Sequence, residues 1–97
     1  MFGDGRLAIR QNAPNPFNPT TRIAFNVPDN AGHVTLTVYD VSGRVVKHLV
    51  DEPLTAGPHT VSWNGRDDGG KDLASGVYFA RLHASGESLF RKMTLLK

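Results

Sequence analysis

Apolar and polar residues alternate along most of this chain, in short runs separated by turn-forming residues. Alternation with a period of two puts one set of side chains on each face of a strand, so each run indicates a half-buried β-strand. The apolar positions that define these runs are Ile23, Phe25 and Val27; Val34, Leu36 and Val38; Val61 and Trp63; Tyr78, Ala80 and Leu82; and Leu89, Met93 and Leu95, with Arg91 interrupting the last series. Residues 7–10 and 44–50 complete about seven predicted strands.

The turns between the runs are rich in Gly, Pro, Asp and Asn. Gly43 and Gly86 stand where a short hairpin requires a residue with positive φ. No stretch of about ten residues carries an apolar stripe of period 3.6 without Gly or Pro, so no substantial helix is expected. Many short strands joined by hairpins favour an all-β sandwich or barrel. We assign it to residues 7–97 and interpret residues 1–6 as a linker remnant or an artificial start.

The segment from Asn12 to Thr20 contains three prolines, each of which lacks a backbone donor. A central strand is therefore excluded here, and we expect an extended, locally stiff crossover. Phe17 is the only large apolar side chain in this segment and is predicted to close one end of the core. The asparagine side chains can cap neighbouring backbone groups.

Composition narrows the class of protein without identifying a reaction. The 97 residues suffice for one small domain, and 39% hydrophobic with 21% charged residues is typical of a globular one. The chain has no cysteine, so it has neither disulfides nor thiolate ligands. The net charge of +2 comes from scattered basic residues, which argues against a nucleic-acid partner. The sequence shows neither a signal peptide nor a run of transmembrane length.

The acidic loop at residues 64–72 is the most suggestive candidate for a ligand site. Residues 65–71 match the start of a P-loop, but Asp72 stands where the pattern requires a Ser or Thr hydroxyl for Mg²⁺, so nucleotide binding is not predicted. Asp67, Asp68 and Asp72 offer hard oxygen ligands and are a weak calcium candidate. The favoured interpretation is a solvated turn whose aspartates cap backbone N–H groups. No other cofactor is expected.

Catalytic side chains are not found in a recognisable arrangement. The four histidines (His33, His48, His59 and His83) lack short ligand spacing and are interpreted as surface residues. No serine stands in a nucleophile elbow. Trp63 and Tyr78 share parity with apolar neighbours and are predicted to point into the core. Tyr39 and Phe79 have the opposite parity and are candidates for an exposed aromatic patch.

Four ordered motifs resemble a known family: residues 11–21 (QNAPNPFNPTT), 38–46 (VYDVSGRVV), 74–79 (ASGVYF) and 92–97 (KMTLLK). They are similar to the C-terminal sorting domain of proteins exported by the type IX secretion system. The motif residues that match are Asn15, Pro16, Phe17, Asn18, Pro19, Gly43, Gly76 and Tyr78. Residues 56–70 also resemble the immunoglobulin-like domain of flagellar hook-capping proteins. Both resemblances imply an immunoglobulin-like antiparallel β-sandwich.

The sorting-domain resemblance implies a noncatalytic module that follows a cargo domain in the same chain. Such a module is recognised by the outer-membrane secretion machinery and ends, after passage through the periplasm, secreted or at the cell surface. The residues implied in recognition are Arg91, Lys92, Met93, Thr94, Leu95, Leu96 and Lys97. A terminal strand of this kind can be presented to a partner at a sheet edge. Two alternatives stay open: a carbohydrate-binding accessory domain that uses Tyr39 or Phe79, and a structural spacer or scaffold.

Overall fold

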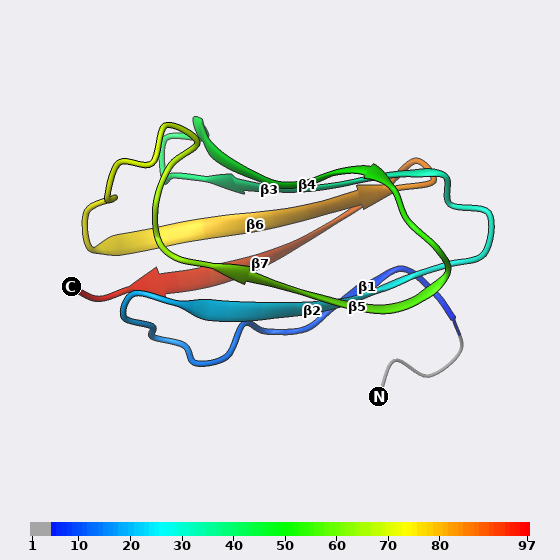
Figure 1. Cartoon of the computed structure of the whole chain (residues 1–97), viewed down its shortest axis with the longest axis horizontal. Coiled ribbons are helices and arrows are strands. Elements are labelled where there is room, and N and C mark those ends of the chain that lie inside the picture. The colour runs from blue at the N-terminus through cyan, green and yellow to red at the C-terminus, as the bar shows by residue number, and fades with distance from the viewer. Residues whose placement is uncertain (1–4) are drawn as a thin grey trace.

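The computed structural model describes residues 5–97, and these form two antiparallel sheets stacked face to face (Figure 1). The three-stranded sheet has the order β1 (Ala8–Ile9), β2 (Thr21–Val27), β5 (Gly57–Trp63), and the four-stranded sheet has the order β4 (Val45–Pro53), β3 (His33–Tyr39), β6 (Gly76–Ala84), β7 (Glu87–Leu95). This arrangement confirms the predicted immunoglobulin-like sandwich of seven strands. The interpretation of residues 1–6 as a linker remnant falls largely on residues 1–4, which lie outside the described residues.

The core lies between the sheets and is built from the alternating apolar positions. Phe25, Leu36 and Leu82 are each fully buried, and Trp63 and Phe17 are each only 1% exposed. Complete burial of a large apolar side chain stabilises a fold by about 1.5–3 kcal/mol, so these positions contribute strongly to stability. The core assignments of Trp63, Tyr78 and Phe17 are confirmed.

Two predicted strand boundaries were wrong. The first strand has only two residues, Ala8–Ile9, although the chain stays beside β2: Arg10 N–H donates to the Ala24 carbonyl at 2.9 Å, and Ala13 forms an isolated bridge with Arg22. The fourth strand continues to Pro53, because the start of β3 extends the pairing as far as His33 opposite Pro53. Two register irregularities in the β3–β4 pair, after Leu36 and after Val38, break the period of two in β4. Alternation alone therefore could not place the end of this strand.

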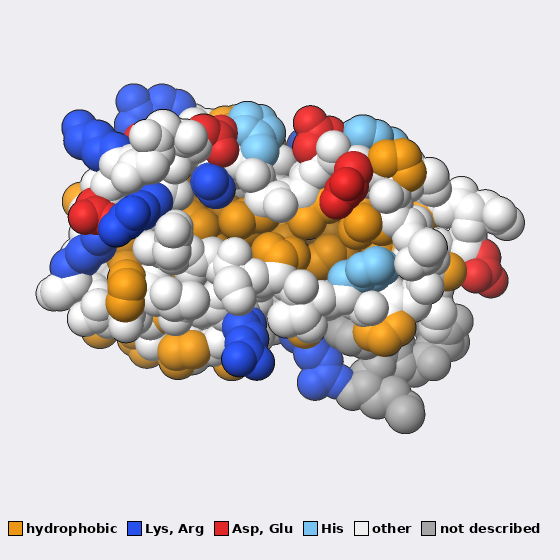
Figure 2. Space-filling model, viewed as in Figure 1, with side chains coloured by type: hydrophobic (Ala, Val, Ile, Leu, Met, Phe, Trp, Pro, Cys, Tyr) orange, Lys and Arg blue, Asp and Glu red, His pale blue; other side chains and the backbone are white. Residues whose placement is uncertain are grey.

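One long side of the sandwich is open, because β4 and β5 are the end strands of their respective sheets. Figure 2 shows hydrophobic side chains exposed in the gap between the sheets on the face turned to the viewer. Leu49, Val50 and Val61 are half-buried and pack against the core from these strands. Among the histidines predicted to be on the surface, His33 and His48 are exposed, whereas His59 is half-buried and stacks on Phe25 with a centroid separation of 5.6 Å. His83 is also half-buried.

The described part of the chain contains no helix that is long and apolar enough to cross a membrane.

Candidate functional site

The last seven residues, which comprise the end of β7 and the two residues after it, are partly buried in the core and partly exposed. Met93 and Leu95 are fully buried, while Arg91, Lys92, Leu96 and Lys97 are exposed. Thr94 is half-buried between them. The seven residues that the sorting-domain resemblance implies are thus not equivalent. Two of them are required by the fold, and four are available to a partner.

The Pro-rich segment lies along the outer edge of β7 and is bonded to it. Phe17 N–H donates to the Thr94 carbonyl at 2.9 Å, and Leu96 N–H donates to the Phe17 carbonyl at 2.9 Å, in a parallel bridge. Thr94 N–H donates to Asn15 Oδ1 at 2.9 Å. Gln11 Nε2 donates to the Lys92 carbonyl at 2.7 Å. We call residues 11–19 and their contacts with β7 the latch.

The latch corrects one expectation from the sequence. We expected the last strand to present an open edge, but the carbonyl of Lys92, the amide and carbonyl of Thr94 and the amide of Leu96 already have partners. A peptide therefore cannot add to this half of β7 as a further strand without first displacing residues 11–19. At this half of β7, the intact domain offers a partner exposed side chains and not a free backbone edge.

Buried aromatic and polar contacts with the core hold the latch in place. The Phe17 ring packs against Trp63 at 5.5 Å, and Trp63 contacts Tyr78 edge to face at 5.7 Å. The buried amide of Asn12 donates to Thr21 Oγ1 at 3.0 Å, and that hydroxyl donates to the Pro14 carbonyl at 2.9 Å. These bonds satisfy the buried side chains of Asn12 and Thr21 and the carbonyl of Pro14.

The remaining motif residues have structural roles or are exposed. Gly43 has a φ of 86° in the β3–β4 turn, which confirms the positive φ predicted there, and Gly86 has a φ of 74°. Gly76 begins β6 with a φ of 154°. Tyr78 donates its hydroxyl to the Ala74 carbonyl at 2.7 Å, and burial raises the pKa of this phenol above its usual value. The other exposed members of the motif are Asn15, Pro16, Asn18 and Pro19.

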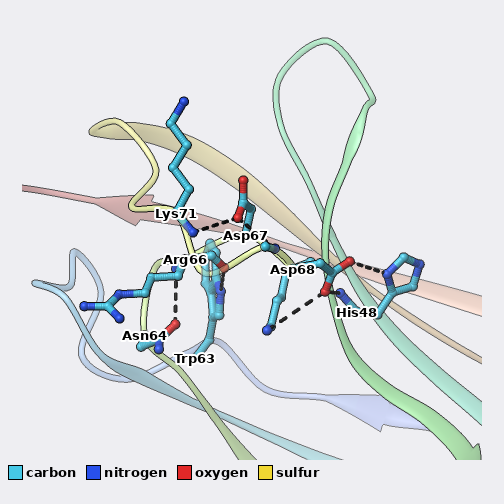
Figure 3. Close-up of polar contacts among 9 residues, drawn as sticks. His48, Trp63, Asn64, Arg66, Asp67, Asp68 and Lys71 are labelled. Atoms are coloured by element: carbon cyan, nitrogen blue, oxygen red, sulfur yellow. Dashed lines mark hydrogen bonds and ion pairs between the residues drawn. The ribbon is translucent and has the colours of Figure 1, made fainter.

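The acidic loop at residues 64–72 does not bring its three aspartates together. Asp67 Oδ1 accepts the amides of Gly69 at 3.0 Å and Lys71 at 2.9 Å (Figure 3), which is the capping role favoured from the sequence. Asp72 instead pairs with Arg66 at 3.0 Å. Across residues 5–97, no group of three or more His, Asp or Glu side chains is placed to hold a metal ion.

Asp68 joins this loop to the outer edge of β4. Its amide donates to the Val46 carbonyl at 3.0 Å, and its carboxylate accepts the His48 amide at 3.0 Å and contacts His48 Nδ1 at 2.6 Å (Figure 3). The His48 amide, followed by the His48 ring, holds the pKa of Asp68 below its usual value. The acidic loop therefore covers part of an exposed sheet edge, which is a common protection against edge-to-edge association.

The outer face of the four-stranded sheet carries the exposed aromatic residues. Tyr39 and Phe79, predicted to be exposed, are half-buried on this outer face and lie directly opposite each other on β3 and β6. Phe90, on β7, is 54% exposed and was missed. Its parity is opposite to that of Leu89 and Met93, so the alternation of β7 already contained the signal.

By sequence, this chain is similar to FlgD proteins. Basal-body rod modification protein FlgD of Salmonella typhimurium is 36% identical over 66 residues, which cover 68% of this chain and 28% of that protein. FlgD of Escherichia coli is 33% identical over 66 residues, 68% of this chain and 29% of that protein. The chain thus spans less than a third of the length of these relatives.

Solved structures with the same fold include two different bacterial components. PorZ, an essential surface component of the type IX secretion system of Porphyromonas gingivalis, aligns with a TM-score of 0.60 at 21% identity, over 94% of this chain and 11% of that one. FlgD from Pseudomonas aeruginosa aligns with a TM-score of 0.56 at 24% identity, over 93% of this chain and 71% of that one. The FlgD Ig-like domain family matches residues 11–88. The chain therefore belongs to the FlgD Ig-like domain family.

Proposed function

We propose that this domain is a noncatalytic sorting and surface-attachment module of a larger exported protein, recognised at a composite surface made of β7 and the latch. The observation that carries this proposal is the parallel bridge between Phe17 and Leu95. Two of the four motifs that resemble sorting domains, residues 11–21 and 92–97, are about 80 positions apart in sequence, and this bridge joins them. A receptor that contacts the end of β7 therefore also meets the Pro-rich motif.

The chemistry of the composite surface suits recognition through side chains. Exposed basic groups, Lys92 and Lys97, and one exposed apolar group, Leu96 at 51% exposure, lie beside the exposed prolines of the latch. Figure 2 shows Lys and Arg side chains gathered toward the end of the sandwich that carries the C-terminus. A receptor with an acidic, partly apolar surface would complement this end. The PorZ structure adds that this fold occurs in a surface component of the type IX system.

Export of a reporter protein tests the proposal in a bacterium that has a type IX secretion system. Deletion of residues 91–97 is uninformative, because it removes Met93 and Leu95 from the core and unfolds the domain. The informative variant is Lys92→Glu combined with Leu96→Ser, since both side chains are exposed. Lys71→Glu is the matched control, because it reverses an exposed lysine in the acidic loop.

We expect the unmodified fusion and the Lys71→Glu fusion to reach the cell surface, while the double variant accumulates in the periplasm. Thermal melting of the purified domains must show that all three are folded. Equal surface display of the double variant would refute recognition at this surface.

A second candidate function is favoured by the family match itself. FlgD relatives are basal-body rod modification proteins, so a scaffold domain within an extracellular assembly is the natural alternative. In that case the domain would confer no export on a fused reporter, and both the unmodified and the variant fusions would remain in the periplasm.

A further inference from the structure

An aromatic patch on the outer face of the four-stranded sheet has no role in the fold or in the proposed sorting surface. We define it by Tyr39, Phe79 and Phe90, which come from three adjacent strands. The cavity at this patch is lined by Tyr39, Asp40, Val41, Gly43, Phe79, Arg81 and Phe90. Val41 at its margin is 75% exposed. Exposed and half-buried apolar groups gathered in one shallow depression on a small domain can mark a binding site.

An arginine without an acidic partner lies among these rings. Arg81 is directly opposite Phe90 in the β6–β7 register, and no carboxylate of residues 5–97 forms an ion pair with it. Its Nε and Nη2 donate to Ser88 Oγ at 3.2 and 2.9 Å, which fixes the plane of the guanidinium. Its Nη1 has only a contact of 3.5 Å, to the Tyr39 hydroxyl, which is too long for a strong hydrogen bond. The guanidinium is thus held in place with donor capacity to spare.

The charge of this face is positive where the rings are. Lys92 lies directly opposite Phe79 in the β6–β7 register and has no ion pair within the described chain. Asp40 is the one acidic residue that lines the cavity, and its carboxylate is already used in the β3–β4 turn. It accepts the Ser42 hydroxyl and amide at 2.6 and 2.9 Å and pairs with Arg44 at 3.3 Å. An anionic ligand would therefore meet a cation and not a free carboxylate.

The size and chemistry of the site favour a sugar over a protein. Seven residues line the cavity, whereas a specific protein interface takes about 20–30 residues on each side. Aromatic rings provide apolar faces on which the C–H face of a pyranose can pack, and the Tyr39 hydroxyl at this site can bond its hydroxyls. A planar guanidinium with free N–H groups is the usual partner of a carboxylate.

We propose that the aromatic patch and Arg81 bind an acidic polysaccharide, with a pyranose ring over Phe90 and Tyr39 and a uronate carboxylate on the Arg81 guanidinium. The rings and Arg81 that carry this proposal lie on the face of the sheet and the latch lies along its edge, while Lys92 borders both surfaces. The proposal therefore goes beyond the sorting function and does not depend on it.

Affinity electrophoresis of the purified domain tests the proposal, with polygalacturonate, alginate and hyaluronate as the acidic polymers and dextran as the neutral one. Phe90→Ala removes an exposed ring, and Leu96→Ala is its matched control, a side chain of similar exposure just after the end of β7. Arg81→Gln removes the cation, and Arg22→Gln is its control on the exposed surface of β2.

We expect at least one acidic polymer to retard the unmodified domain while dextran does not. Phe90→Ala and Arg81→Gln should each weaken the interaction about tenfold, and the two controls should leave it unchanged. Added NaCl should weaken binding of the unmodified domain and of Phe90→Ala, but should affect Arg81→Gln much less, because screening acts on the ion pair.

Absence of retardation by all three acidic polymers would overturn the proposal. Retardation that survives in both Phe90→Ala and Arg81→Gln would also overturn it, because a nonspecific attraction to the basic domain would then explain the binding. Equal retardation by dextran would refute the role assigned to Arg81. Melting curves of each variant ensure that a loss of binding is not a loss of fold.

Discussion

Removal of the Phe17 ring tests whether the Pro-rich segment is part of the folded structure or only lies beside it. Phe17 is 1% exposed and its ring packs against Trp63 at 5.5 Å. Replacement of a buried Phe by Ala costs about 3–5 kcal/mol, through lost transfer free energy and the cavity that remains. A domain of this size is stabilised by only about 5–15 kcal/mol in total. Phe17→Ala should therefore remove a large share of its stability.

Urea unfolding followed by Trp63 fluorescence measures this loss, because Trp63 is the only tryptophan in the chain and is in contact with the mutated ring. We expect a lower midpoint with an unchanged slope, and a melting temperature reduced by roughly 12 °C or more at about 4 °C per kcal/mol. Val41→Ala is the control. Its side chain is 75% exposed, so its effect should stay within about 0.5 kcal/mol.

Hydrogen exchange separates loss of the latch from general destabilisation. The amide of Leu96 donates to the Phe17 carbonyl, and the amide of Thr94 donates to Asn15 Oδ1. Under conditions where the variant remains folded, both amides should exchange faster in Phe17→Ala than amides in the middle of β6. A cost below about 1 kcal/mol, or unchanged exchange at Thr94 and Leu96, would refute the docking of this segment.

Three further outcomes are expected. Gly65→Ala should destabilise the domain by about 1–3 kcal/mol, because Gly65 has a φ of 74° and an added Cβ would lie 3.2 Å from the Pro19 carbonyl oxygen. Thermal melting measures this loss. Gly69→Ala is the control and should cost less, because φ at Gly69 is not positive. The pKa of Asp68 is lowered in the folded state, so its contribution is present above the unfolded pKa of about 3.9 and is lost as the pH falls through the lower folded value. The urea midpoint of Asp68→Asn should therefore fall less steeply from pH 5 to pH 2 than that of the unmodified domain or of Asp29→Asn, and equal slopes would refute this role. Because the three loop aspartates have separate partners, calcium and EDTA should give the same melting temperature, and a rise with calcium would show that the loop rearranges to bind it.

The sequence predicted which side chains are buried, because burial follows from the pattern within one segment. It did not predict the contacts between segments that are far apart in the chain. Alternation identified the buried faces of β2, β3 and β6, because a period of two is a property of each strand alone. The core position of Phe17 followed from its being the only large apolar group in its segment. Its backbone bonds to Thr94 and Leu96 could not be predicted. They depend on β7 being the end strand of its sheet and on the Pro-rich segment lying next to it, and neither fact is encoded in the local sequence.

The candidate site shows the same division. The parity of Tyr39 and Phe79 placed both rings on the outer face of the sheet, where they are half-buried, and the exposed third ring, Phe90, could have been found in the same way. That Arg81 lies opposite Phe90 depends on the β6–β7 register. Likewise, Asp68 reaches β4 because the acidic loop folds back over an end strand, and nothing in the local sequence indicates that partner.

The orientation of the bridge between Phe17 and Leu95 has a mechanical consequence. The segments that contain Phe17 and Leu95 are parallel. The C-terminus and the start of the described chain lie toward opposite ends of the sandwich (Figure 1). Tension applied between the two ends would pull the segment at Phe17 one way and β7 the other, along the direction of both strands. The two hydrogen bonds of the bridge would then bear the load in shear and rupture together, not one after the other as in unzipping. The domain would therefore resist extension along its length through this pair of strands.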